Sequence, residues 1–320
     1  MAARFVLPGL ACPFDEEISD YAGDVGRHVV DWATQYGLPQ GDTDAIRLAE
    51  IKVGRLAART TPRASLAALE LLADWQMWLF LFDDQYCDES VIGSDLTRLS
   101  QLVTALMLVL DNVTGLRFRE GPFTMALGDI MDRLNAMASY PQAARFIKAV
   151  RGYLLGLFWE AGHRATDQPA SLDEYAAMRR HSGAVPTCMA LIDLTEGFEL
   201  RCDEYWRPDV RELSDLAVNV TCWANDILSF PKETERSLKV HSLPAVLASE
   251  RRLPMAEALT IAAGMHNAEV ARYTELERAL GAQAGPELLG YFAGLRSWMA
   301  GNFHWSLETG RYKVAATCDG

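Results

Sequence analysis

The sequence has few cysteines and fewer basic than acidic residues, and each shortage excludes a class of protein. The six cysteines of this 320-residue chain include no CxxC pair or other zinc spacing, so we expect neither a zinc site nor a disulfide framework, and a reducing cytoplasm fits. The 30 Lys and Arg residues against 43 Asp and Glu give a net charge of −13, with no basic stripe. Nucleic acid and anionic membrane surfaces are therefore poor partners.

Long hydrophobic runs are also missing. The longest, such as residues 102–110, are too short to span a bilayer, so we expect no membrane insertion. The N-terminus contains an arginine and a Pro-Gly pair and has no sustained apolar run, so it does not read as a signal peptide. Half of all residues are hydrophobic, which is enough to build one large folded domain.

Period-two alternation, which marks half-buried strands, is absent too, and apolar residues recur at helical spacing instead. We predict an all-α protein in which residues 1–320 form a single helical-bundle domain, with residues 1–14 and 313–320 flexible. The predicted helices cover residues 15–35, 43–59, 64–86, 95–111, 122–138, 141–165, 172–181, 186–198, 208–230, 242–250, 254–281 and 286–312. Pro186, shortly after Gly183, predicts a break that either lines a cavity or is a plain loop.

The predicted helix 64–86 is apolar until its end, where carboxylates gather in the run Phe80-Leu-Phe-Asp-Asp-Gln-Tyr-Cys-Asp-Glu89. At 100° per residue, one helix face carries Gln76, Leu79, Phe80, Asp83 and Cys87. An apolar wall and its first carboxylate would thus point the same way. Asp84 and Asp88 form an i, i+4 pair that repels when both are ionised, so a nearby divalent cation is a natural reason for the cluster. The alternative is a solvated acidic helix end.

A second cluster recurs every four residues, at Asn225, Ser229 and Glu233, and so falls within about an 80° arc of one helix face. An amide oxygen, a hydroxyl and a carboxylate form an oxygen-only ligand set that suits Mg²⁺ or Mn²⁺ better than zinc. With one formal charge, the set would hold a metal tightly only when an anionic substrate completes the shell, which indicates a diphosphate. The alternative is a polar helix face, and Pro231 weakens the geometry because its ring clashes with the carbonyl of Ile227.

These two clusters resemble the metal motifs of bacterial class I terpene synthases. Asp83-Asp84 with Asp88 looks like the aspartate-rich motif of that family, and the run Asn225-Asp-x-x-Ser229-x-x-Lys232-Glu233 is similar to its second metal motif. One departure is Cys87, which stands where many members have a carboxylate. Either Asp88 or Glu89 is then left to serve as the distal acid of the first motif.

Two further motifs follow in the family's order. Arg179 stands 46 residues before Asn225, where bacterial members carry a diphosphate-sensing arginine, and Ser182-Gly183 correspond to their linker and effector positions. Trp305-x-x-x-Thr309-x-Arg311-Tyr312 matches their C-terminal arginine and tyrosine pair. Ser182 replaces a more common aspartate, which predicts a weaker coupling between Arg179 and Gly183.

The resemblance implies the fold of class I terpenoid synthases and a reaction on a prenyl diphosphate with three Mg²⁺ ions, or Mn²⁺ in their place. The ions and neighbouring side chains would neutralise the diphosphate, so that the C–O bond ionises to an allylic cation. The implied metal ligands are Asp83, Asp84, Asp88, Asn225, Ser229 and Glu233. The implied catalytic residues are Arg179, Ser182, Gly183, Arg311 and Tyr312, and the implied substrate-binding residues are Arg179, Lys232, Arg311, Tyr312, Phe80 and Trp305.

The carbocation formed in such a reaction needs a dry, mildly electron-rich pocket. Candidates to line it are Phe80, Trp223, Phe303 and Trp305, each of which is alternatively ordinary core. We expect farnesyl diphosphate as the substrate, with geranyl and geranylgeranyl diphosphate as open alternatives. A chain-elongating prenyltransferase or a non-catalytic prenyl-lipid-binding protein are remote alternatives, because the former would show a second aspartate-rich motif and the latter would not need both metal motifs. The family also implies a homodimer.

Overall fold

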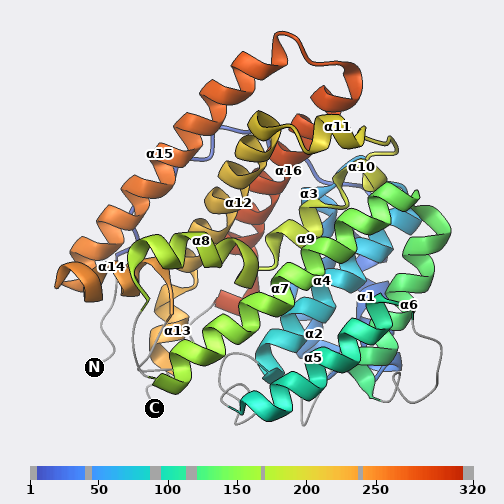
Figure 1. The fold of residues 1–320 in the computed structure, drawn as a ribbon, viewed down its shortest axis with the longest axis horizontal. Coiled ribbons are helices and arrows are strands. Elements are labelled where there is room, and N and C mark those ends of the chain that lie inside the picture. Colours follow the sequence, from blue (N-terminus) through green and yellow to red (C-terminus); the bar gives the residue numbers. More distant parts are fainter. Residues whose placement is uncertain are drawn as a thin grey trace.

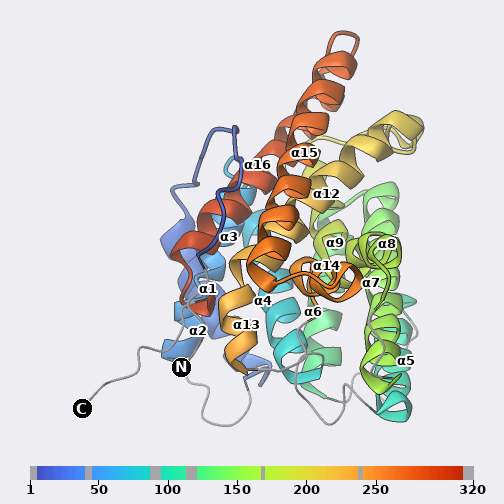
Figure 2. The ribbon, with the colours of Figure 1, turned by 90° about the vertical axis from the view of Figure 1, so that its left-hand side faces the viewer.

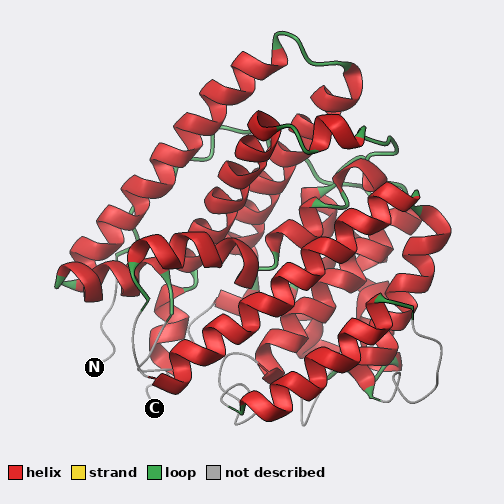
Figure 3. Cartoon of the chain, viewed as in Figure 1, coloured by secondary structure: helices red, strands yellow, loops and turns green. Residues whose placement is uncertain are grey.

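Helices form all the regular elements in the part of the chain that the structure, a computed structural model, describes. The described residues are 6–39, 45–86, 95–112, 121–166, 170–236 and 241–312. Figure 3 shows these residues as helices joined by short loops, with no strand among them. The prediction of an all-α protein is confirmed. The expected distal acids Asp88 and Glu89 lie outside the described residues, as do residues 1–5 and 313–320.

The helices of the first half are α1 (Ala22–Gln35), α2 (Ala45–Ile51), α3 (Val53–Thr60), α4 (Leu66–Tyr86), α5 (Leu96–Leu110), α6 (Pro122–Met137), α7 (Tyr140–Thr166) and α8 (Leu172–Ser182). Those of the second half are α9 (Val185–Met189), α10 (Ile192–Thr195), α11 (Cys202–Tyr205), α12 (Pro208–Leu228), α13 (Phe230–Arg236), α14 (Leu243–Arg251), α15 (Met255–Gly281) and α16 (Pro286–Glu308). A short 3₁₀ turn, η2 (Gly310–Tyr312), follows α16. Figure 1 labels most of them along the chain.

The centre of the first half is α4, which packs against α1, α3 and α6. Its side chains are buried on most sides, as expected of a helix that is apolar nearly all round. Trp75 and Trp78 are fully buried and stack on each other, and Phe82 stacks on Trp78. This aromatic column fixes α4 in the core and leaves its other face free to border a cavity.

The second half is built around α12, which packs against α15, α16, α14 and α8. Figure 2 shows α12, α15 and α16 running side by side. Apolar side chains from α1 to α16 form one continuous hydrophobic cluster, so the two halves share a core. Among the described residues, no helix has the length and apolarity that crossing a membrane requires.

The predicted helix 43–59 is divided in the structure, because Lys52 adopts a left-handed conformation with φ of 59° between α2 and α3. The Arg55 N–H donates to the carbonyl of Lys52, and the carbonyl of Ile51 instead accepts bonds from the C-terminal end of α16. Trp305 Nε1 and Thr309 Oγ1 each donate to it at 2.9 Å. The α2–α3 junction thereby holds the chain that enters η2.

The break predicted at Pro186 is confirmed. α8 ends at Ser182, Ala184 is left-handed with φ of 58°, and Pro186 lies in the first turn of α9. The weakening predicted at Pro231 also appears, since α12 ends at Leu228 and α13 begins at Phe230. The predicted helix 15–35 begins later, at Ala22, and the short helix α11 had no recognised signal in the sequence.

Candidate active site

A cavity of about 630 Å³ opens at one end of the bundle, between α4, the α8–α9 break, α12, α13, α16 and η2. Every described member of the predicted site lines it. These residues are Phe80, Asp83, Asp84, Arg179, Ser182, Gly183, Asn225, Ser229, Lys232, Glu233, Trp305, Arg311 and Tyr312. Residues far apart in sequence thus meet around one space, as the motif order implied. The remaining predicted ligand, Asp88, lies outside the described residues.

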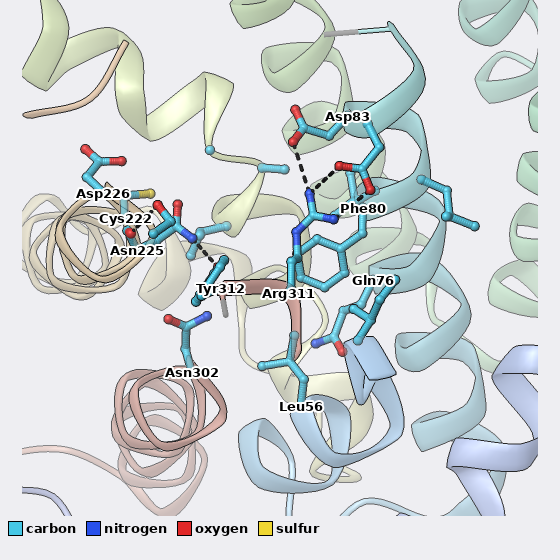
Figure 4. Close-up of a pocket in the computed structure, with 18 of the residues that line it drawn as sticks. Leu56, Gln76, Phe80, Asp83, Cys222, Asn225, Asp226, Asn302, Arg311 and Tyr312 are labelled. Atoms are coloured by element: carbon cyan, nitrogen blue, oxygen red, sulfur yellow. Dashed lines mark hydrogen bonds and ion pairs between the residues drawn. The ribbon is translucent and has the colours of Figure 1, made fainter. Parts of the chain in front are cut away.

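The predicted face of α4 lies against this cavity. Gln76, Leu79, Phe80 and Asp83 all line it, which confirms the face assigned from 100° per residue. Figure 4 shows Gln76, Phe80 and Asp83 succeeding one another along the helix. The apolar side chains of Leu79 and Phe80 and the carboxylate of Asp83 therefore do lie on the same side of α4.

Arg311 joins the C-terminal turn to the acidic rim of α4. Its Nη1 and Nη2 donate to the two oxygens of Asp84 at 2.7 and 2.9 Å, and Nη2 lies 3.5 Å from Asp83 Oδ2 (Figure 4). Burial acts to lower the pKa of the Arg311 guanidinium, but Asp84 and Asp83 outweigh it and raise that pKa above its usual range. The guanidinium carbon also lies 4.8 Å from the centroid of the Phe80 ring. Arg311 is a fixed cation placed between carboxylates and an aromatic face.

Of the four aromatic residues expected to line a cation pocket, two lie elsewhere. Phe80 and Trp305 line the cavity and stack with ring centroids 5.3 Å apart. Trp223 and Phe303 are not among the lining residues. Trp223 is 5% exposed and belongs to the hydrophobic cluster, so ordinary core was the correct interpretation for it, whereas Phe303 is only partly buried and is not among the residues of that cluster.

The second oxygen cluster straddles the junction of α12 and α13. Ser229 Oγ lies 2.6 Å from Glu233 Oε1 and 2.7 Å from the Asn225 carbonyl oxygen. The Asn225 side chain accepts a bond from Arg179 Nη2 at 2.9 Å and donates through Nδ2 to the Tyr312 hydroxyl. The interruption near Pro231 does not separate the cluster, because the Glu233 N–H still donates to the Ser229 carbonyl at 3.1 Å.

Tyr312 reaches this cluster from η2. Burial raises the pKa of its phenol above the usual value, so the hydroxyl stays protonated near neutral pH. Figure 4 shows Tyr312 between Asn225 and Arg311. The C-terminal pair thus contacts both oxygen clusters. Arg311 contacts the carboxylates of α4, and Tyr312 contacts Asn225 of α12.

Asp226 is the site residue that sequence reasoning missed. It is 2% exposed and accepts bonds from Arg179 Nε at 2.9 Å, from the Tyr175 hydroxyl at 2.6 Å and from the Leu243 N–H at 3.1 Å. Burial acts to lower the pKa of the Arg179 guanidinium, but Asp226 raises it well above the usual range. A buried carboxylate with such partners positions Arg179 toward Asn225. The only signal in the sequence was an acid directly after Asn225, one step off the expected face.

The α8–α9 break lines the cavity, which decides between the two interpretations left open by the sequence. A Cβ atom on Gly183 would come 2.7 Å from Cys222 Sγ and 2.9 Å from the Arg179 carbonyl oxygen, so no larger side chain fits there without a shift. Ser182 Oγ is buried and has no hydrogen-bond partner among the described residues. The break presents its backbone to the cavity beside Arg179.

The donor chemistry fits hard divalent cations. Oxygen donors line the rim in two places, on α4 and at the α12–α13 junction, and such sets suit Mg²⁺ or Mn²⁺. The cations Arg179, Lys232 and Arg311 line the same cavity. Carboxylates and cations facing one space can together bind metal ions and a polyanion, and the cavity beneath them is partly apolar.

Comparison with known proteins agrees with this chemistry. Residues 74–272 match the family described as "Terpene synthase family 2, C-terminal metal binding". The chain is 31% identical to the 4-epi-cubebol synthase ((2E,6E)-farnesyl diphosphate cyclizing) of Streptosporangium roseum, over 97% of this chain and 93% of that one. It is 35% identical to the (+)-T-muurolol synthase ((2E,6E)-farnesyl diphosphate cyclizing) of Roseiflexus castenholzii, over 95% of this chain and 93% of that one.

Solved structures show the same fold. The crystal structure of 2-methylisoborneol synthase from Streptomyces coelicolor A3(2), in complex with Mg²⁺ and 2-fluoroneryl diphosphate, superposes with a TM-score of 0.88 at 25% identity, over 98% of this chain and 99% of that one. The SVS_A2 protein from ancestral sequence reconstruction superposes with a TM-score of 0.87 at 27% identity, over 94% of this chain and 90% of that one.

Proposed function

Because this chain belongs to the bacterial class I terpene synthase family, whose description includes metal binding, we propose that it ionises farnesyl diphosphate and cyclises the resulting cation to a sesquiterpene. The observation that carries the proposal is that two oxygen-only donor sets meet Arg179, Lys232 and Arg311 around one cavity of about 630 Å³. The names of the two relatives support a substrate with a fifteen-carbon prenyl chain, since both are described as cyclising farnesyl diphosphate.

The two donor sets would hold the metal ions, three Mg²⁺ by the family expectation, with Mn²⁺ as the alternative. Asp83 and Asp84 stand on one side and the cluster of Asn225, Ser229 and Glu233 on the other, with Asp88 or Glu89 as the distal acid. Bound there, divalent cations supply positive charge that stabilises the departing diphosphate. Both sets consist of oxygen donors, the ligand type that Mg²⁺ prefers.

Arg179, Lys232 and Arg311 would bind the diphosphate oxygens, and Tyr312 would donate a hydrogen bond to them. In the arrangement described here, Arg311 grips Asp84 and Arg179 is held by Asp226 and Asn225. We propose that Arg311 turns from Asp84 toward the phosphate when a polyanion binds. Asp84 would then be one of the carboxylates that could hold a metal ion.

The Phe80 ring would contact the carbocation once Arg311 has turned away from it. A desolvated cation–π contact is worth roughly 2 kcal/mol, and a difference of that size between competing transition states changes a product ratio by about 30-fold. We expect Phe80→Leu to keep releasing diphosphate but to give more acyclic and early-quenched products, measured by gas chromatography with mass spectrometry. Phe82→Leu is the matched control, because Phe82 lies on α4 against Trp78 and away from the cavity. An unchanged product profile in Phe80→Leu would assign Phe80 to ordinary packing.

The experiment that tests the function is incubation with geranyl, farnesyl and geranylgeranyl diphosphate in parallel, with headspace chromatography of the products. We expect cyclic fifteen-carbon products that disappear with EDTA and return with Mg²⁺ but not with Zn²⁺, since the donors are all oxygens. Elongated diphosphates would instead indicate a prenyltransferase, and binding without diphosphate release would indicate a non-catalytic lipid-binding protein. Turnover that persists in the chelator contradicts the assignment of both metal sites.

We also propose that residues 1–320 form a single class I domain, which the continuous hydrophobic cluster from α1 to α16 supports. A cytoplasmic location is proposed from the cysteines, since the four described ones are free. Homodimerisation stays a prediction from the family. Size-exclusion chromatography with light scattering measures it directly.

A further inference from the structure

Gln76 is a buried amide whose hydrogen bonds are unaccounted for. It lies on the cavity face of α4, is 3% exposed, and neither Oε1 nor Nε2 has a hydrogen-bond partner among the described residues. Leaving such groups unpaired loses their hydration without a compensating hydrogen bond, so buried amides in native proteins nearly always find a partner, in protein or in ordered water. The partner of Gln76 must therefore come from the cavity that it borders.

Two more unpaired polar atoms face the same cavity from α16. Trp298 is 3% exposed, and within the described part of the chain its Nε1–H has no acceptor and the buried Asn302 Oδ1 has no donor. The two residues are an i, i+4 pair, so their side chains are neighbours on one helix face, and both line the cavity. Figure 4 shows Asn302 and Gln76 on two sides of the cavity, away from Asp83.

The position of these groups separates them from the metal sites. Gln76 precedes Asp83 by seven residues on the same face of α4, which places its Cα about 10 Å further along the helix axis. The hydrocarbon part of a prenyl diphosphate would lie at that level, where polar groups serve no purpose for an apolar chain. A water molecule in a protein needs two to four polar partners, and Gln76, Trp298 and Asn302 offer both donors and acceptors.

We propose that Gln76, Trp298 and Asn302 hold ordered water in the inner part of the cavity, and that this water captures the carbocation, so that the main product is a sesquiterpene alcohol. The inference rests on the function proposed above. The water oxygen forms a C–O bond to the cationic carbon, the resulting oxonium loses a proton, and the released diphosphate takes up that proton. Farnesyl diphosphate and water thus give one alcohol and one diphosphate, with no oxidant or reductant.

The position of Gln76 explains how this water would act late. Gln76 lies about 10 Å along α4 from Asp83, so water held there would be remote from the metal-binding end where the C–O bond ionises, and nearer to a cationic centre formed further along the chain after ring closure. A second role of the amides, in which their carbonyl oxygens stabilise the cation directly, would give a hydrocarbon. The origin of the oxygen atom in the product separates these two roles.

The first measurement uses the unmodified protein with farnesyl diphosphate and Mg²⁺ in H₂¹⁸O, with product mass spectra and diphosphate release recorded together. We expect mainly an alcohol whose mass rises by one ¹⁸O atom. Diphosphate release with hydrocarbons alone, or an alcohol without the label, overturns the water proposal while the cyclase function stands. Absence of diphosphate release overturns the function itself and the inference with it.

The second measurement compares variants. Gln76→Met keeps the side-chain shape and removes its donor and acceptor, and Asn302→Leu does the same on α16. Each loses about one hydrogen bond to the water, so the ratio of alcohol to hydrocarbon should fall about tenfold while diphosphate release continues. Thr221→Val is the matched control, because Thr221 also lines the cavity but its hydroxyl is bonded to the Ala217 carbonyl within α12.

Thermal melting of each variant checks that it is folded, and the labelling of the unmodified protein needs no variant. A ratio that stays unchanged in both folded variants contradicts the assignment of the water to these side chains. A ratio that falls equally in Thr221→Val contradicts it too, because the loss would then follow from cavity shape alone.

Discussion

Replacing Asp83 by Asn is expected to lower diphosphate release from farnesyl diphosphate by about 10³-fold or more. The carboxylate stands at the rim on the cavity face of α4, where it would bind metal, and an amide is neutral and a poorer ligand for Mg²⁺. A metal ion supplies several kcal/mol of charge stabilisation as the C–O bond breaks, and about 4 kcal/mol corresponds to 10³ in rate. A coupled assay for released diphosphate measures the effect.

A measurement of thermal stability distinguishes a loss of metal binding from unfolding of the variant. The side chain of Asp83 is 39% exposed and lies 3.5 Å from Arg311, so removing its charge should change stability by no more than about 1 kcal/mol. Asp215→Asn is the matched control, because Asp215 is also 39% exposed and lies 3.0 Å from Arg180, but it does not line the cavity. Both variants should melt near the parent temperature, and only Asp83→Asn should lose activity. Activity within tenfold of the parent would remove Asp83 from the metal set.

Replacing Arg179 by Lys is expected to lower kcat by about 100-fold. The guanidinium uses Nε for Asp226 and Nη2 for Asn225, both at 2.9 Å, and a planar fork of this kind can still present further N–H groups to a phosphate. Lysine keeps the positive charge, but its single ammonium group cannot donate to Asp226, Asn225 and a phosphate at the same time. Loss of two charge-assisted bonds corresponds to about 3 kcal/mol, or roughly 100-fold. Steady-state kinetics should show the change in kcat more than in KM.

The neighbouring arginine supplies the control for this variant. Arg180 Nε donates to Asn219 Oδ1 at 2.9 Å and its Nη1 to Asp215 Oδ2 at 3.0 Å, so it bridges α8 and α12 with the same kinds of partner. None of these three residues lines the cavity. Arg180→Lys should therefore lose the same contacts and keep parent kinetics. Equal loss of kcat in both variants would mean that Arg179 acts only by joining the two helices.

The sequence predicted those features of the fold and site that depend on local spacing. The face of α4 that carries Gln76, Phe80 and Asp83 followed from 100° per residue, and the break before α9 followed from Pro186. The cluster of Asn225, Ser229 and Glu233 followed from its four-residue repeat. Such features are fixed by backbone geometry that a single segment carries with it.

Features that depend on tertiary contacts could not be read in this way. Lys52 divides α2 from α3 without glycine or proline, because the Ile51 carbonyl is bonded by α16 from more than 250 residues away. Asp226 belongs to the site through partners on α8 and at the first residue of α14, neither of which a helix-face argument on α12 includes. Whether Trp223 borders the cavity or lies in the hydrophobic core depends in the same way on which helices pack against α12. The spacing of residues along α12 does not predict those contacts.

The bonds from Trp305 and Thr309 to Ile51 join positions 254 and 258 residues apart, and they set the order in which the protein can mature during synthesis. At about 5–20 residues per second, a ribosome adds the acceptor tens of seconds before either donor. The early helices can pack meanwhile, but Arg311 and Tyr312 reach the rim only after α16 has left the ribosome and docked. A nascent chain would therefore lack Arg311 and Tyr312, the two C-terminal residues proposed to bind diphosphate, and we expect it not to ionise prenyl diphosphates before these residues have docked.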